Sequence, residues 1–305
     1  MFVIAAPGQG SQKPGFLEPW LDHPHYRAQL TSWSAAIGVD LVAHGTTSDL
    51  ETITDTAIAQ PLIVAAGIMT GRAVLEALPG SPSLQMAGHS VGEFTAAALA
   101  GVLTDEDALR LVALRGRAMA AASALEPTGM SAVIGGEPAD LDQALGHHGL
   151  FAANFNGGGQ TVIAGAKDAL ARFAEAPPAG TRVIPLSVAG AFHTPYMASA
   201  VASLAAAAAA LAPGDPQFPL YTNRDGSLVS SGATYVSYLV DQVARPVRWD
   251  LCMESFARGE ITGMMELTPA GALTGLAKRG LKGVPTVAIN SPDDIALALE
   301  MVTGA

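Results

Sequence analysis

Short apolar runs alternate with longer segments of helical period over the first third of the chain. Residues 1–7 form one such run and are expected to be a buried first strand. Residues 60–78 repeat apolar side chains at helical spacing, with Pro61 in the expected first turn. They lead through 79–82 to a second apolar run at 84–87. This strand, helix, strand order predicts a parallel sheet.

A second helix is predicted from Thr104 to about residue 124, with Thr104 as its N-cap. Its apolar face also carries Arg115, whereas Arg110 and Arg117 fall on the opposite face, where solvated salt bridges are expected. An inward arginine needs a carboxylate partner, because an unpaired buried charge is costly. That partner is either a side chain or a substrate, and position alone does not decide between them.

From residue 130 to 188 the pattern changes to β-α-β-β-α-β. Strands are predicted at 131–134, 150–155, 160–164 and 182–188, and helices at 138–146 and 167–174. This order is that of a ferredoxin-like unit. We therefore expect a small ferredoxin-like subdomain over 128–189, inserted in a large α/β subdomain made of 1–127 and 190–305.

Charge and cysteine content narrow the function classes. The 16 basic and 27 acidic side chains of this 305-residue chain give a net charge of −11, which opposes non-specific nucleic-acid binding. An acidic partner would therefore need a local basic patch. The single cysteine, Cys252, excludes an internal disulfide, agrees with a reducing compartment and is expected to be a buried thiol.

Neither a membrane span nor a metal site is expected. No continuous apolar run reaches roughly 18 residues, and the first residues lack a basic leader, so a cytoplasmic protein is predicted. The seven histidines form no HExxH motif and no Cys/His pairing. No coiled coil or exposed apolar stripe demands a dimer, so we expect a monomer.

Candidate chemistry begins at Gly88-His89-Ser90-Val91-Gly92, between the apolar run at 84–87 and an alanine-rich helical segment. Glycines on both sides let the chain turn sharply from strand to helix and lift the serine hydroxyl out of the sheet. This geometry makes Ser90 a nucleophile candidate. The backbone N–H of Val91 is then in place to bind an oxyanion, and the loop 8–10 can supply a second donor.

A serine hydroxyl needs a base, and His193 is the best candidate. It precedes Thr194 and Pro195, an expected N-cap and first helical residue, and the positive end of that helix would help keep the imidazole neutral. His89, next to the serine, is expected to point away from it.

Seven segments occur in the order seen in malonyl-CoA:acyl-carrier-protein transacylases, the acyltransferase family of fatty acid and polyketide synthesis. They are Gly8-Gln9-Gly10-Ser11-Gln12, Gly88-His89-Ser90-Val91-Gly92-Glu93, Arg115-Gly116-Arg117-Ala118-Met119, Gly129-Met130-Ser131-Ala132-Val133, Asn154-Phe155-Asn156, Ala191-Phe192-His193-Thr194 and Pro246-Val247-Arg248-Trp249. The resemblance spans almost the whole chain. It implies an α/β-hydrolase-like core with a ferredoxin-like insertion.

The resemblance implies a ping-pong reaction. Ser90 would attack the thioester of malonyl-CoA, and His193 would move the proton. The malonyl group would then pass from Ser90 to the phosphopantetheine thiol of an acyl carrier protein. No cofactor would be bound permanently. The oxyanion would be held by Val91 N–H and by the backbone near Gln9.

The resemblance also assigns supporting residues. In place of an acidic triad member, a backbone carbonyl at Gln242 would orient the histidine. Arg115 matches the arginine that binds the malonyl carboxylate. The substrate pocket would include Met119, Asn154, Asn156 and Phe192, although hairpin capping is an equal interpretation of Asn156. Independently of the resemblance, the densest basic cluster of the chain, Lys278, Arg279 and Lys282, is a candidate docking surface for an acidic carrier protein, although a solvated helix end is the simpler interpretation.

Three alternatives stay open. A free-standing acyltransferase that serves a polyketide synthase would share this chemistry and fold. A thioesterase or esterase would need an Asp or Glu to orient His193 and would not need Arg115. A non-catalytic carrier-protein binder would have no use for the combination of Ser90, His193 and Arg115.

Overall fold

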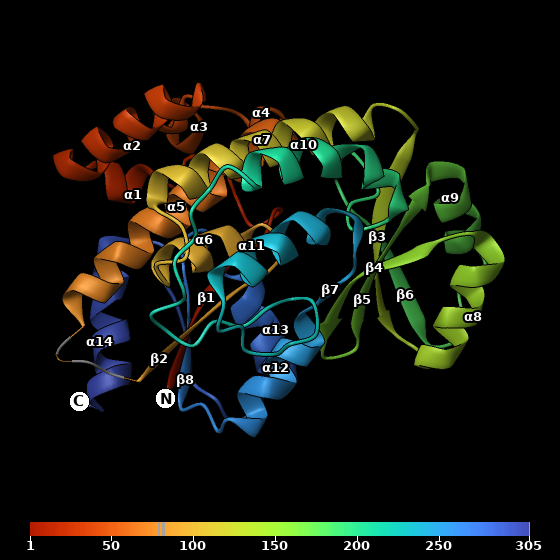
Figure 1. Ribbon diagram of the computed structural model, residues 1–305. Helices are drawn as coiled ribbons and strands as arrows, with labels where there is room; N and C mark the ends of the chain where they lie inside the picture. Colours follow the sequence, from red (N-terminus) through yellow and green to blue (C-terminus); the bar gives the residue numbers. More distant parts are fainter. Residues whose placement is uncertain (79, 81–82, 305) are drawn as a thin grey trace.

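The computed structural model describes residues 1–78, 80 and 83–304 (Figure 1). The predicted connection at 79–82 lies largely outside these residues. The strands are β1 (Phe2–Ala6), β2 (Leu84–Gly88), β3 (Thr128–Gly135), β4 (Phe151–Gly157), β5 (Gln160–Ala166), β6 (Thr181–Pro185), β7 (Val247–Arg248), β8 (Gly263–Glu266) and β9 (Thr286–Ala288). The helices are α1 (Glu18–Leu21), α2 (Pro24–Ile37), α3 (Leu41–Thr46), α4 (Leu50–Thr54), α5 (Thr56–Ala77), α6 (Gly92–Leu99), α7 (Asp105–Ser123), α8 (Pro138–His148), α9 (Lys167–Glu175), α10 (Ala198–Ala208), α11 (Gly232–Asp241), α12 (Trp249–Arg258), α13 (Ala272–Gly280) and α14 (Ile295–Thr303).

The larger part of the molecule is built on a parallel sheet of order β2-β1-β8-β9. Side chains along β1 alternate between its two faces. Ile4 and Ala6 enter the core beneath α5, α6 and α7, whereas Val3 and Ala5 pack with α12 and α13. Both faces are therefore covered, which explains the continuous apolar character of the strands. The predicted α/β class with a parallel sheet is confirmed.

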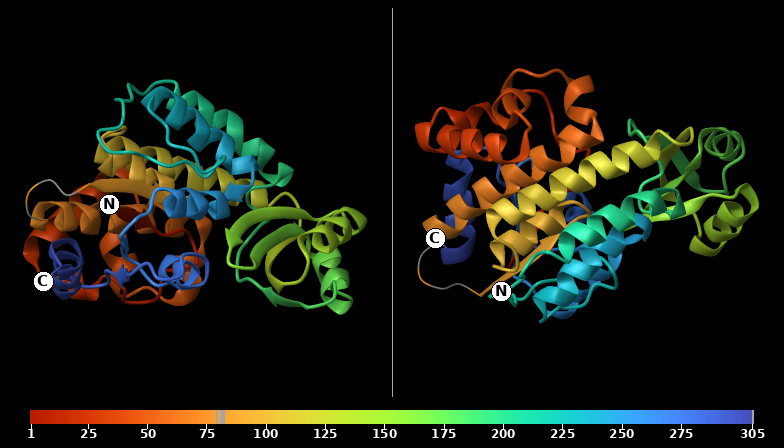
Figure 2. Two further views of the ribbon diagram at one scale, coloured as in Figure 1. Left: turned by 90° about the horizontal axis from the view of Figure 1, so that it is seen from below. Right: turned by 45° about the horizontal axis from the view of Figure 1, so that its top comes forward.

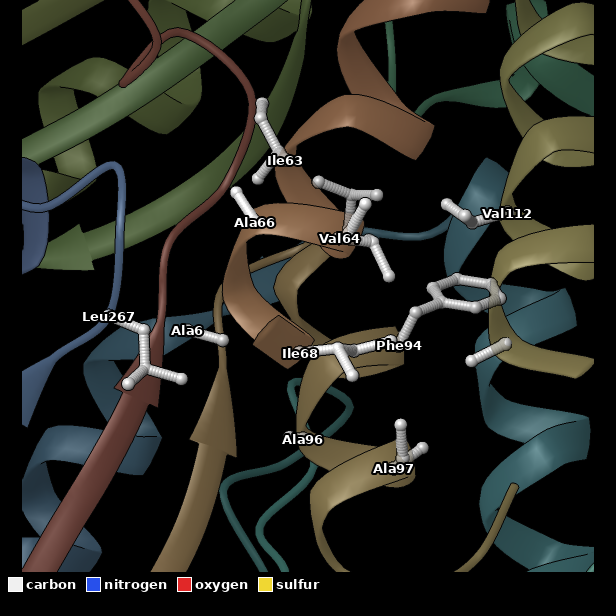
Figure 3. Packing of buried hydrophobic residues seen from close by; sticks show 14 of the residues in the cluster. Ala6, Ile63, Val64, Ala66, Ile68, Phe94, Ala96, Ala97, Val112 and Leu267 are labelled. Carbon is white, nitrogen blue, oxygen red and sulfur yellow. The ribbon is translucent and has the colours of Figure 1, made fainter. Parts of the chain in front are cut away.

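Helix α5 is the central helix of this core (Figure 3). It starts at Thr56, earlier than predicted, because the side chain of Asp55 caps it by accepting from Ala57 N at 2.8 Å. Pro61 therefore lies inside the helix and not in its first turn. By length and composition α5 could cross a membrane, but 83% of its most apolar window is buried inside the protein.

The second sheet lies at the opposite end of the molecule from both termini (Figures 1 and 2). Its strand order is β6-β3-β5-β4-β7, and α8 and α9 pack on it around a separate apolar core. Residues 128–185 supply β3 to β6 with the two helices between them, in the predicted β-α-β-β-α-β order. The edge strand β7 comes from the later part of the chain and pairs in parallel with β4. The subdomain limits at 127/128 and 189/190 stay a prediction.

Candidate active site

Ser90 lies in the sharp turn between β2 and α6. Its φ is +53°, which side-chain-bearing residues adopt at a cost. The glycines on either side permit this turn because there is no room for a side chain. A Cβ on Gly88 would lie 2.1 Å from the backbone of Gly92, and a Cβ on Gly92 would lie 2.2 Å from the carbonyl oxygen of Ala6. The predicted strand-to-helix turn is thus present.

A hydrogen-bonded chain runs from Ser90 through His193 to Gln242. Ser90 Oγ lies 2.7 Å from His193 Nε2. His193 Nδ1 lies 2.8 Å from the backbone oxygen of Gln242. Because a carbonyl oxygen only accepts, Nδ1 carries the proton and Nε2 is free to accept the serine proton. The histidine is therefore set in the tautomer that a base requires.

His193 is buried, with 4% of its surface exposed. Burial, followed by the positive charge of Arg115, lowers the pKa of His193 to about 3. The sequence predicts that the helix after Thr194 helps to keep this ring neutral. That segment begins as a short 3-10 helix, Pro195–Met197, capped by Thr194, and the main causes of the neutral state lie elsewhere.

Arg115 points inward from α7, as its position in the helical period predicts, and is 1% exposed. Its Nη1 donates to Gln60 Oε1 at 2.7 Å, and its Nη2 donates to Gln242 Oε1 at 2.9 Å. Nε is buried and has no hydrogen-bond partner within the described residues. Burial lowers the pKa of Arg115 to about 10, so the group stays charged at neutral pH. It therefore retains its positive charge and has an N–H group without a partner among the described residues.

The acidic group of this network is Glu93, a residue whose role no sequence pattern indicates. Glu93 is 1% exposed, and its carboxyl group accepts from Gln242 Nε2 and, at 2.7 Å, from Asn223 N. Burial raises the pKa of Glu93 to about 8. Glu93 contacts Arg115 only through the carboxamide of Gln242. No residue in the described part of the chain forms a direct ion pair with the guanidinium.

Asn223 is a second residue that the sequence did not reveal. Its Oδ1 accepts from Ser90 N at 2.7 Å, and its Nδ2 donates to Gly88 O at 2.8 Å. One side chain thus holds both ends of the strained turn. No motif marks Asn223, because its role depends on an approach of segments distant in sequence.

Two backbone amides beside Ser90 are available to a ligand. In the described part of the chain, neither Val91 N nor Gln9 N meets an acceptor. The side chain of Gln9 is directed to Thr54 O and Thr56 Oγ1, both at 3.4 Å. Ser90 N is occupied by Asn223 and is unavailable.

A cavity of about 530 Å³ opens at Ser90 and is lined by both parts of the molecule. The predicted pocket residues Met119, Asn154, Asn156 and Phe192 all line it, together with Arg115 and His193. His89 also lines the cavity and makes no hydrogen bond to Ser90; its Nε2 lies 2.8 Å from Asn156 Oδ1. That contact joins β4 of the second sheet to the turn that carries Ser90.

The basic cluster of α13 divides in two. Arg279 is exposed and lines the cavity, whereas Lys278 and Lys282 are exposed outside it. Elsewhere, Cys252 is fully buried, as expected. No group of three or more metal-binding side chains occurs in residues 1–78, 80 and 83–304.

Comparison with known proteins agrees with this geometry. Residues 2–294 match the family model described as an acyl transferase domain. The malonyl CoA-acyl carrier protein transacylase of Mycobacterium tuberculosis (strain ATCC 25618 / H37Rv) is 49% identical, over 97% of this chain and 98% of its own. The transacylase of the same name from Escherichia coli (strain K12) is 34% identical, over 98% of this chain and 99% of its own.

Solved structures show the same similarity. The crystal structure of MCAT from Mycobacterium tuberculosis has a TM-score of 0.94 at 48% identity, and the match covers 98% of this chain and 99% of that one. A malonyl-transacylase in complex with a type II PKS acyl-carrier protein, PlMCAT:AntF, has a TM-score of 0.92 at 34% identity. The match covers 98% of this chain and 99% of that one.

Proposed function

Because this chain belongs to the acyltransferase family of the malonyl CoA-acyl carrier protein transacylases, we propose that Ser90 carries a malonyl group from malonyl-CoA to an acyl carrier protein. The protein is an S-malonyltransferase of fatty acid synthesis. The observation that supports the assignment of Ser90 is its hydrogen bond to His193, 2.7 Å long, in a cavity that also holds Arg115.

In the first half-reaction Ser90 Oγ attacks the thioester carbonyl while His193 Nε2 takes the hydroxyl proton. The C–S bond then breaks, and His193 returns the proton to the coenzyme A thiolate. In the second half-reaction the phosphopantetheine thiol gives its proton to His193 and attacks the malonyl ester. Ser90 Oγ leaves and recovers the proton.

The oxyanion of each tetrahedral intermediate is held by the backbone N–H groups of Val91 and Gln9. Neither N–H meets an acceptor within the described residues, and both residues line the cavity beside Ser90. Gln242 orients the base through its backbone carbonyl, at 2.8 Å from His193 Nδ1. An acidic group is not needed there, because a neutral ring with a fixed tautomer serves as the base.

Arg115 binds the malonyl carboxylate. Its guanidinium is anchored by two amide oxygens, those of Gln60 and Gln242; it keeps its charge, and these two hydrogen bonds use only part of its set of N–H donors. A planar guanidinium matches a carboxylate in geometry and charge. A thioesterase or esterase would have no use for a buried arginine held in this way, and among the described residues the base is oriented by a backbone carbonyl, not by an acidic side chain.

The remaining pocket residues shape the acyl site. Phe192, 6% exposed, precedes the base and crowds the space beside the α-carbon of the acyl group. Exclusion of one methyl group is worth about 1–3 kcal/mol, so preference for malonyl over methylmalonyl is finite. Met119, Asn154 and Asn156 complete the wall, and Asn156 in addition fixes His89.

An acidic carrier protein would dock on the exposed basic cluster Lys278, Arg279 and Lys282 at one side of the cavity. Such a cluster is needed because the protein itself has a net charge of −11. Lys278→Glu and Lys282→Glu together should raise KM for the carrier protein and leave KM for malonyl-CoA unchanged. Unchanged carrier kinetics would exclude docking at the two lysines.

We expect the enzyme to be monomeric.

Transfer is tested with the acyl-enzyme. The protein is incubated with malonyl-CoA, freed of small molecules and mixed with holo acyl carrier protein. The malonyl group should move to the carrier and the enzyme should return to its unmodified mass. Release of free malonate with an unmodified carrier would instead indicate a thioesterase.

Service to a polyketide synthase is a second candidate, favoured by one observation. The structural relative at TM-score 0.92 is described with a type II PKS acyl-carrier protein. The half-reactions would be the same. Comparison of kcat/KM for fatty acid and polyketide carrier proteins decides between the two.

A further inference from the structure

The charge of the active-site cavity is opposite to that of the protein. The chain carries 27 acidic side chains and a net charge of −11, yet no Asp or Glu is found among the described residues that line the cavity. Its cationic side chains are Arg115 and Arg279. A carboxylate-free cavity with two guanidinium groups is suited to a ligand that carries negative charge at two separate places.

The two arginines occupy different depths. Arg115 is 1% exposed and belongs to the network beneath Ser90, whereas Arg279 is exposed on α13. A malonyl thioester of phosphopantetheine has a matching distribution of charge. Its carboxylate is at the acyl end, its phosphate is at the far end of the pantetheine arm, and the arm between them is uncharged.

Arg279 is prepared to bind an anion. No carboxylate in the described part of the chain forms an ion pair with it. Its stem lies against the hairpin at Gly158: a Cβ built on that glycine would be 2.9 Å from Arg279 Cβ and 3.6 Å from Nε. The hairpin therefore restricts the side chain, which lowers the entropy lost when a ligand binds.

We propose that Arg279 binds the phosphate of the phosphopantetheine arm, the anionic group that coenzyme A and the carrier protein have in common. This inference rests on the proposed function. It separates Arg279 from the two neighbouring lysines, which lie outside the cavity and can meet only the surface of the carrier. Arg279 would thus serve both half-reactions, with Arg115 and Arg279 holding the two ends of the same acyl arm.

The test uses three malonyl donors: malonyl-CoA, malonyl-phosphopantetheine and malonyl-pantetheine, which lacks the phosphate. The rate of Ser90 malonylation gives kcat/KM for each donor. The wild-type enzyme should prefer malonyl-phosphopantetheine to malonyl-pantetheine by about tenfold, as expected for one charge-assisted contact near solvent. Arg279→Ala and Arg279→Gln should abolish this preference by slowing the reaction with malonyl-phosphopantetheine about tenfold.

Arg172→Ala is the matched control, because Arg172 is an exposed arginine on α9, paired with Asp168 and outside the cavity. It should keep the wild-type preference. The proposal is overturned if Arg279→Ala keeps the preference for the phosphorylated donor, or if the wild type shows no such preference. It is also overturned if the variant is slower only with malonyl-CoA and not with malonyl-phosphopantetheine, because Arg279 would then bind the nucleotide part of coenzyme A. Failure of the proposed function is distinct, since the wild type would then accept no malonyl group from any donor.

Discussion

His193 Nε2 lies 2.7 Å from Ser90 Oγ, although 103 residues separate the two in the chain. Each is held at a positive φ, +61° for His193 and +53° for Ser90. Both strained residues are buried and fixed from behind, His193 by the Gln242 carbonyl and Ser90 by Asn223. Strain of this kind persists only where the surroundings over-determine the conformation, which is common at reactive sites.

The environment of His193 predicts an unusual pH dependence. Its pKa is lowered to about 3, so the base is already neutral well below the usual value near 6.5. The rate of Ser90 malonylation should therefore not fall as the pH drops from 7 to 5. Single-turnover rates across this range measure it. A decline centred near pH 6.5 would show that His193 titrates as an ordinary histidine.

Arg115→Ala should separate malonyl from acetyl transfer. Loss of a buried, charge-assisted contact to the malonyl carboxylate should reduce kcat/KM for malonyl-CoA by at least about 100-fold. Acetyl-CoA has no such carboxylate and should be affected far less. The ratio of the two specificity constants, in the variant and the wild type, gives the result. Equal losses for both donors would remove the carboxylate role.

Asn223→Ala should slow acylation through the turn at Ser90. The change leaves Ser90 N and Gly88 O without their partner, and an unsatisfied buried group costs about 1–3 kcal/mol. We expect the folded variant to be malonylated about tenfold more slowly, as measured by mass spectrometry of samples quenched at successive times.

Asn290→Ala provides the control, since Asn290 contacts Ala270 in a loop that does not line the cavity. It should lower the melting temperature without a change in the acylation rate. If both variants slow malonylation equally, Asn223 has only a general structural role.

Local signals explain which parts of the site the sequence could predict. The elbow at Ser90 follows from glycine spacing, and the inward direction of Arg115 follows from the helical period; both depend only on neighbours in the chain. Gln60, Glu93 and Asn223 act through partners more than 50 residues away. Glu93 in particular resembles an ordinary acidic residue in a first helical turn. Only the fold shows that it is buried beneath Gln242.

The helix limits illustrate the same point. Thr104 is an N-cap, as predicted, because its hydroxyl oxygen accepts from Asp107 N at 3.0 Å. This contact depends only on neighbouring residues, so the local sequence is enough to predict it. Pro61 suggested a helix start near residue 60, but α5 begins about one turn earlier, at Thr56, after its cap Asp55. Burial of almost the whole helix outweighs the N–H that Pro61 lacks. Tertiary packing decides where local preferences conflict.

Cys252 should be inert in the native protein. It is fully buried, its Sγ donates to Thr222 O at 3.4 Å, and burial raises the pKa of its thiol well above the usual value. An aromatic disulfide that releases a coloured thiolate on reaction with a thiol should release none with the folded enzyme. After unfolding it should release one equivalent per chain, since the sequence has a single cysteine. Rapid reaction in the native state would contradict the packing around α12.

The central claim is that Ser90 itself carries the malonyl group. The intact protein is weighed after incubation with malonyl-CoA alone, and the modified peptide is then identified, with Ser90→Ala as the control. We expect a mass gain of one malonyl group, located at Ser90 and absent from the variant. An unmodified wild-type protein, or an adduct that persists in Ser90→Ala, would contradict it.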